Sequence, residues 1–418
     1  MSTSGDRTSW ELLVDRQFGS LFWGKLLSAA GVWTHNVVAA IAVYAMTGSA
    51  LMAGLVTVSQ ASPQLVLTML SGRMADQGDA VRQAIAGRII SAAGSGFLAV
   101  WLMLDISPGA SWPFLVASLV VGLGFVLGGP ALQSVVPALV SPDEFTRAMA
   151  LNGLPLILAR AAGPALGAAI GSQADPTVAF AFAAATHLAF AALIRAARLP
   201  RATVLTGDVD YSVMAALRFV WRDRRMFALM VAMGVVGFAS EPSLSLAPAL
   251  AAYVEASPHD AGLLPTTFGI GAILGFALRP VVSRLISIDA LPGWGLLVMA
   301  VGLGACSLPS SLTVAATALL VCGVGFSVAM TSVTTLIQLR APVELRGRVM
   351  ALWLVAFLGV RPISAALLGL IADLSSVAVA MGATAVATVM TVWLVPPRQR
   401  RTSTRPADDS DAAPPPAA

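Results

Sequence analysis

Long apolar stretches recur along almost the entire chain, separated by short polar turns such as Ser107-Pro108-Gly109. Most stretches reach about 20 residues, the length that an α-helix needs to cross a bilayer. Because only helices and closed barrels satisfy every backbone hydrogen bond in lipid, these stretches predict membrane-spanning helices. Twelve spans are predicted, at residues 19–45, 50–70, 84–105, 112–140, 148–172, 177–196, 226–254, 263–287, 293–309, 311–338, 349–372 and 376–395.

The predicted spans fall into two sets of six, and the sequence repeats between the sets. Residues 139–151 resemble residues 339–352, and residues 164–175 align with residues 362–373. The pattern predicts an all-α membrane protein with twelve transmembrane helices in two six-helix repeats, an architecture that places a site between the halves. We expect a cytoplasmic N-terminal segment at residues 1–18 and a six-helix half at 19–196. A cytoplasmic linker at 197–225, a second six-helix half at 226–395 and a disordered cytoplasmic tail at 396–418 would follow.

The positions of the basic residues predict how the chain lies in the membrane. Of the 25 Lys and Arg residues, all but Lys25, Arg160 and Arg361 are assigned to segments at one side of the membrane. Positive charge collects in cytoplasmic loops, so we expect a multi-pass protein of the cell (inner) membrane with both termini in the cytoplasm. The net charge of +4 then reflects topology, and no nucleic-acid partner is expected.

Three motifs resemble a known family. Residues 72–82, GRMADQGDAVR, resemble the signature G-x-L-A-D-R-x-x-R-R, and residues 338–350 are similar to a P-x-E-x-x-G-R-V/I stretch. Residues 163–167, GPALG, resemble the Gly-Pro motif that exporters carry in their fifth span. Together they resemble the major facilitator superfamily, in its twelve-span drug:proton antiporter branch, which includes macrolide-efflux and enterobactin-exporter proteins. The likeness extends from about residue 18 to 395.

The resemblance implies two groups of functional residues and a monomer. A conformational lock between the halves would involve Gly72, Asp76, Arg82, Glu344 and Arg348, with the Asp76 carboxylate at its centre. The exporter motif, Gly163, Pro164 and Gly167, would seal an exit, or would only let helices pack closely. Gln77 stands where the family has Arg, which predicts a weaker lock. The alternative is that Asp76 is a solvated turn residue.

Charged groups inside the bilayer are costly and therefore mark candidate sites. Glu241 is the acid deepest within a predicted span, and Pro242 should break that helix beside it. We expect Glu241 to couple transport to protons or to attract a cation, or else to be a structural partner of an arginine or a residue at the outer mouth. Arg160 and Arg361 are candidates for an anionic substrate, for pairing with Glu241, or for snorkelling. His35 is a weaker candidate for proton coupling.

The sequence predicts a secondary transporter that exports an amphipathic or hydrophobic, drug-like small molecule by proton antiport and alternating access. A dedicated exporter of a siderophore or other anionic metabolite is the alternative within this class. A non-transporting membrane scaffold or sensor is the alternative from another class. We find no nucleophile–base pair, metal-ligand cluster or phosphate loop, so we expect neither an enzyme nor a cofactor or metal. The expected partners are the small-molecule substrate, protons and the lipid bilayer.

Overall fold

The computed structural model describes residues 7–141, 143–173, 175–200, 214–308 and 311–395. Within these ranges some helical side chains also lie outside the description, among them those of Asp76, Arg160 and Pro164. The described residues fold into helices joined by turns and loops, without a strand. Nine segments of this part of the chain are long and apolar enough to cross a membrane, and two further apolar helices are shorter. The predicted all-α class is confirmed.

Two bundles of helices correspond to the two predicted repeats. The N-terminal half consists of α2 (Phe18–Thr47), α3 (Ala50–Gln77), α4 (Ala80–Met103), α5 (Trp112–Val135), α6 (Phe145–Gln173) and α7 (Pro176–Ala197). The C-terminal half consists of α9 (Arg224–Ser240), α10 (Pro242–Ser245), α11 (Ala247–Tyr253), α12 (Leu263–Leu285), α13 (Leu291–Cys306), α14 (Leu312–Arg340), α15 (Arg346–Leu358), α16 (Val360–Leu374) and α17 (Val377–Val392). Helices α9 and α10 lie within one candidate membrane span, Arg224–Ser245, which α11 follows, and α15 and α16 lie within another, Arg346–Leu374.

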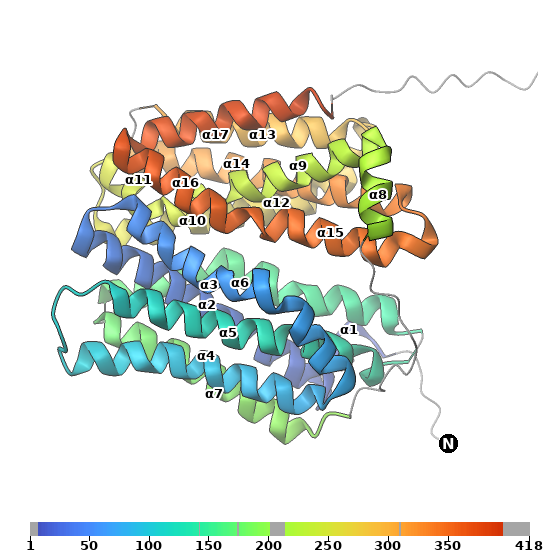
Figure 1. Ribbon diagram of the computed structural model, residues 1–418, viewed down its shortest axis with the longest axis horizontal. Coiled ribbons are helices and arrows are strands. Elements are labelled where there is room, and N and C mark those ends of the chain that lie inside the picture. Colours follow the sequence, from blue (N-terminus) through green and yellow to red (C-terminus); the bar gives the residue numbers. More distant parts are fainter. Residues whose placement is uncertain (1–6, 142, 174, 201–213, 309–310, 396–418) are drawn as a thin grey trace, which may run out of the picture.

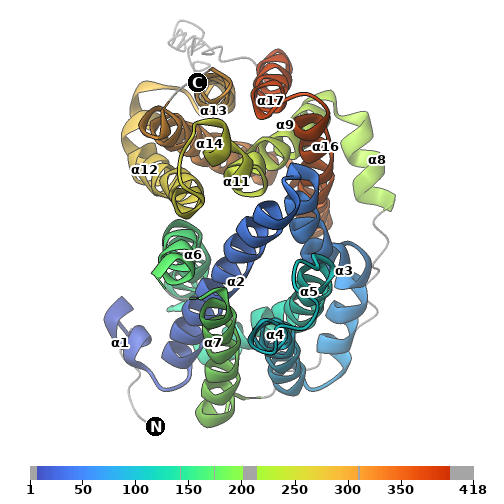
Figure 2. The same cartoon turned by 90° about the vertical axis from the view of Figure 1, so that its left-hand side faces the viewer.

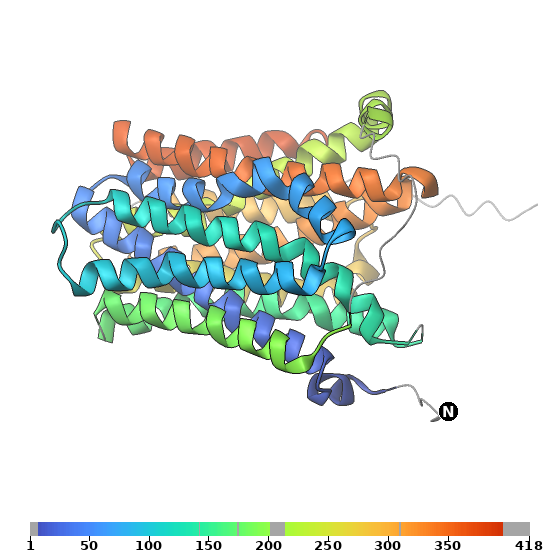
Figure 3. The same ribbon diagram turned by 60° about the horizontal axis from the view of Figure 1, so that its bottom comes forward.

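The halves lie side by side with their helices along the long axis of the molecule (Figure 1). Helix α6 lies beside α12, and α3 lies beside α16 (Figure 2). The short helices α1 (Ser9–Val14) and α8 (Met214–Arg222) lie at one end of the bundle (Figure 1 and Figure 3). We call it the arginine-rich end, because the connections at the opposite, arginine-poor end contain neither Lys nor Arg.

Polar side chains at the connections fix where the spans begin. Ser49, Asp79, Asp175 and Ser376 each accept a hydrogen bond from a backbone N–H in the first turn of the helix that follows. These N-caps satisfy donors that have no partner within the helix. At the end of α2, Gly48 adopts a left-handed conformation with φ of 64° and donates its N–H to the carbonyl of Tyr44.

One detail differs from the sequence interpretation. Arg88 was counted among the charges at the cytoplasmic side, although the predicted span 84–105 includes it. In the structure α4 begins at Ala80, so Arg88 lies more than two turns inside the helix and is buried. The apolar run beyond Arg88 marks only part of α4, because the first turns contain small and polar residues. Within the linker expected at residues 197–225, the structure places a short helix, α8, at Met214–Arg222.

Candidate functional site

An ion pair buried in the C-terminal half joins two residues singled out from the sequence. The Nε of Arg361 donates to Oε2 of Glu241 at 2.8 Å. The side chain of Glu241 is 0% exposed and that of Arg361 is 19% exposed. Pairing of Glu241 with Arg361 was one of the alternatives, and the geometry confirms it. Since an isolated buried charge costs several kcal/mol, the pairing offsets part of the cost of burying the two charges.

Breaks in two spans position this pair. Helix α9 ends at Ser240 and α10 begins at Pro242, so Glu241 lies at the predicted break of the seventh span. Helices α15 and α16 meet at Gly359, two residues before Arg361. The hydroxyl of Ser364 donates to the carbonyl of Phe238 at 2.7 Å and ties α16 to α9. The backbone therefore holds both side chains where two non-consecutive helices meet.

Several neighbouring helices contribute no charged residue near the pair. Helices α3, α12, α14 and α17 pack near it, and their residues 50–72, 263–278, 312–339 and 377–392 include no Asp, Glu, Lys, Arg or His. Residues 226–240 of α9 include none either.

Arg361 also borders a cavity of about 180 Å³ between the two halves. Helices α2, α3 and α5 supply most of its wall, and α10, α15 and α16 close it from the other half. Its lining is Ala29, Val32, Trp33, Asn36, Thr57, Gln60, Ala61, Gln64, Gly122, Phe125, Leu244, Leu358 and Arg361. Apolar and aromatic walls with a few polar groups and one cationic side chain are typical of a small-molecule site.

A pair of amide side chains lies in the wall opposite Arg361. The Nδ2 of Asn36 on α2 donates to Oε1 of Gln60 on α3 at 2.5 Å. Gly122 on α5 packs against the backbone carbonyl of Gln60, and a Cβ at position 122 would collide with it. This contact fixes the Gln60 backbone at the cavity. The sequence analysis did not single out Asn36 or Gln60.

His35 lies within the N-terminal half and does not line this cavity. Its ring nitrogens are each 3.1 Å from a serine hydroxyl, Nδ1 from Ser95 and Nε2 from Ser118. Nearby, Arg88 donates to Ser28 Oγ at 2.9 Å, and the same hydroxyl is 2.9 Å from His187 Nδ1. These contacts join α2, α4, α5 and α7 within one half, which indicates a structural role.

The expected exporter motif lies where α6 crosses α2. A Cβ on Gly163 would lie 2.5 Å from Cβ of Trp33, and one on Gly167 would lie 2.8 Å from Cα of Thr34. Both glycines thus allow a close approach of the two backbones. Because Trp33 lines the cavity, this approach also sets one wall of the candidate site. The side chains of Pro164 and Arg160 lie outside the described residues.

The expected lock residues lie at the arginine-rich end. Arg82 is exposed, and its Nε is 3.4 Å from Oδ2 of Asp79, three residues earlier. Glu344 is exposed, and Gly72 has open space where a Cβ would stand. Asp76 lies outside the described side chains. The contacts of Arg82 do not bridge the two halves, and the lock stays a prediction.

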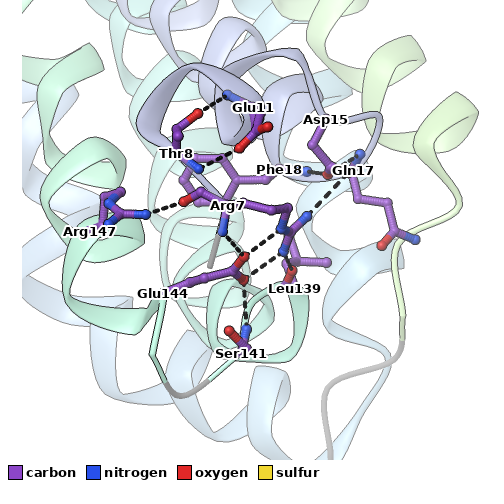
Figure 4. A network of polar contacts seen from close by, with 10 residues as sticks. All are labelled: Arg7, Thr8, Glu11, Asp15, Gln17, Phe18, Leu139, Ser141, Glu144 and Arg147. Carbon is purple, nitrogen blue, oxygen red and sulfur yellow. Dashed lines mark hydrogen bonds and ion pairs between the residues drawn. The ribbon is translucent and has the colours of Figure 1, made fainter. Parts of the chain in front are cut away.

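A network missed by the sequence analysis holds the N-terminal segment to the same end (Figure 4). Arg7 forms two bonds to Glu144, from Nε at 2.7 Å and from Nη2 at 2.8 Å, and its backbone N–H donates at 3.1 Å. The backbone N–H of Ser141 donates to Glu144 at 2.9 Å. The Arg7 guanidinium, followed by the N–H of Ser141, holds the pKa of Glu144 well below its usual range. The sequence analysis included Glu144 only within the repeated stretch at residues 139–151.

Comparison with known proteins places the chain in a family. The sequence matches the family described as transmembrane secretion effector over residues 7–416. The chain belongs to this family of major facilitator transporters. The enterobactin exporter of Salmonella choleraesuis (strain SC-B67) is 26% identical over 361 residues, and that of Salmonella typhi is 27% identical over 368 residues; each match covers 84% of both chains. As a member of a transporter family, the protein is not an enzyme.

Solved structures confirm the major facilitator fold. A peptide transporter of the POT type superimposes with a TM-score of 0.72 at 15% identity, over 90% of this chain and 93% of that one. A bacterial homologue of the human lysosomal transporter Spinster, in an inward-facing and unoccupied conformation, gives 0.72 at 15% identity, over 91% and 96%. The fold and family together make the protein a multi-pass membrane transporter.

Proposed function

We propose that this transporter exports an anionic organic metabolite, of the siderophore kind, from the cytoplasm by alternating access. The observation that carries the proposal is Arg361, a cationic group at a cavity between the two halves of an exporter-family fold. The relatives matched over 84% of the chain are enterobactin exporters. Trp33 and Phe125 in the cavity wall suit a ligand that combines a negative charge with apolar or aromatic groups.

The proposed direction follows from the distribution of charge and from contacts between the halves. The arginine-rich end would face the cytoplasm, with both termini there. At the arginine-poor end, Asp373 of α16 accepts a hydrogen bond from the backbone N–H of Ala50 at the start of α3. Gly369 of α16 packs closely against α3, because a Cβ at this position would lie 2.7 Å from Cα of Leu51. These contacts favour a state closed toward the outside, in which a substrate would enter from the cytoplasm.

The ion pair would respond to the charge of the substrate. An anion that binds Arg361 competes with Glu241 for the guanidinium, so its binding would break the pair. A lipophilic cation would instead compete with the proton at Glu241, which is the antiport predicted from the sequence. Drug:proton antiport is therefore the second candidate, supported by the burial of Glu241.

Transport by purified protein in liposomes tests the proposal. We would follow efflux of enterobactin and of tetraphenylphosphonium, a lipophilic cation, together with internal pH. Enterobactin efflux that falls at least about tenfold in Arg361→Gln, but not in Arg222→Gln on α8, would support anion export. Efflux of the cation alone, with loss in Glu241→Gln, would favour antiport. Efflux of neither compound would contradict both proposals and favour a non-transporting role.

A further inference from the structure

The amide pair in the cavity wall leaves hydrogen-bonding capacity unused. The bond between Asn36 and Gln60 occupies one N–H of Asn36 and one oxygen of Gln60. Asn36 Oδ1 and Gln60 Nε2 are buried, and neither has a partner among the described residues. Asn36 is only 6% exposed. Buried polar atoms are normally hydrogen-bonded, so two adjacent exceptions that line a cavity point to a ligand or water that completes them.

The unused capacity has a defined chemistry. The two atoms of the pair that lack a partner are one acceptor, Asn36 Oδ1, and one donor, Gln60 Nε2. Rotation of both amides by 180° exchanges oxygen and nitrogen, yet it again leaves one donor and one acceptor. A carboxylate only accepts and an ammonium group only donates, so either would leave one atom of the pair unpaired. A neutral amide group, with C=O and N–H, satisfies both.

We propose that Asn36 and Gln60 form a recognition site for an amide group of the transported molecule. The inference rests on the proposed function and adds a second recognition element to it. Asn36 and Gln60 belong to the N-terminal half, whereas Arg361 belongs to the C-terminal half, and all three line one cavity. A ligand that carries an amide and a carboxylate would therefore contact both halves, so its binding favours the state in which the halves lie close together.

Two matched compounds test the proposal on the unmodified protein. Hippurate has a phenyl ring, a secondary amide and a carboxylate, and O-benzoylglycolate replaces only the amide N–H by an ester oxygen. The ester leaves the acceptor of the pair unsatisfied. We expect full-length protein in nanodiscs to bind hippurate about tenfold more tightly, by isothermal titration calorimetry, which corresponds to about 1.4 kcal/mol. Equal affinities, or no binding of either compound, would overturn the proposal.

Variants show whether the pair is responsible. Asn36→Leu and Gln60→Met keep the approximate side-chain volume and remove the amides, so both should bind the two compounds equally. Ser62→Ala on the same helix removes only a bond to the carbonyl of Ser59 and should keep the preference. A preference that persists in correctly folded Asn36→Leu and Gln60→Met would also overturn amide recognition. Arg361→Gln should lower the affinity for both compounds by the same factor. A failure of the proposed anion site can therefore be told apart from a failure of amide recognition.

Discussion

Asp373, at the end of α16, accepts a hydrogen bond from the hydroxyl of Ser49, at the start of α3, over 2.5 Å. Its carboxylate also accepts from the backbone N–H groups of Ala50 at 2.6 Å and Leu51 at 3.1 Å. A residue of the C-terminal half thus caps a helix of the N-terminal half. The carboxylate satisfies first-turn donors and interacts favourably with the helix N-terminus. We interpret this contact as a latch at the arginine-poor end.

Asp373→Asn should weaken the latch and favour opening at this end. Because Asp373 is exposed, we expect a loss of about 1 kcal/mol, or roughly fivefold in the equilibrium. Spin labels would be attached at Met46→Cys and Leu374→Cys, both exposed sites at this end. Double electron–electron resonance should then show a larger population of long distances between the labels. Asp105→Asn, an acid in the α4–α5 connection, serves as a control. An unchanged distance distribution in Asp373→Asn would argue against the latch.

The sequence repeat aligns Asp373 with Asp175, but the two residues have different partners. Asp175 caps its own following helix through the N–H of Thr177, at 2.7 Å. In the second half Ser376 caps α17 instead, accepting from Val379 N–H at 3.2 Å. Asp373 is thereby available to the other half. The repeat could be predicted from similarity, whereas this bond depends on the three extra residues between Asp373 and α17 and on how the halves pack.

The close crossing of α2 and α6 should require glycine at position 163. Gly163→Ala would place a Cβ 2.5 Å from that of Trp33, and such overpacking costs about 1–3 kcal/mol. We expect a lower melting temperature in scanning fluorimetry and weaker ligand binding, since Trp33 lines the cavity. Gly153→Ala on the same helix meets open space and should leave stability unchanged or raise it. Equal behaviour of the two variants would contradict this role.

The candidate site was only partly predictable. Glu241 and Arg361 stand out in apolar runs because a charge in the bilayer is rarely tolerated without a role. Asn36 and Gln60 have no such signal, because amides occur in many helices and their pairing depends on how α2 packs against α3. Arg88 was counted with the cytoplasmic charges, but α4 begins at Ala80 and encloses it. Patterns along the chain predict helices and isolated charges, whereas contacts between helices need the fold.

The Arg7–Glu144 pair should make stability depend on pH in one direction. The pKa of Glu144 is lowered in the folded protein, so its contribution is present above the unfolded value, about 4.3, and is lost as pH falls through the folded value. Glu144→Gln should lower the melting temperature at pH 7, and the difference from the unmodified protein should shrink in strong acid. Glu344→Gln, the exposed repeat-related residue, is the control. A difference that grows on acidification would contradict this assignment.

The Glu241–Arg361 pair should behave as a coupled unit in a double-mutant cycle. Arg361→Gln leaves a fully buried carboxylate without its guanidinium, which costs about 3 kcal/mol at neutral pH, whereas Glu241→Gln leaves a partly exposed cation and should cost less. The double variant, with two neutral amides, should lose less stability than the sum of the single variants. Melting temperatures of the unmodified protein, the two single variants and the double variant at pH 8 test this. Strictly additive losses would show that the ion pair contributes no coupling.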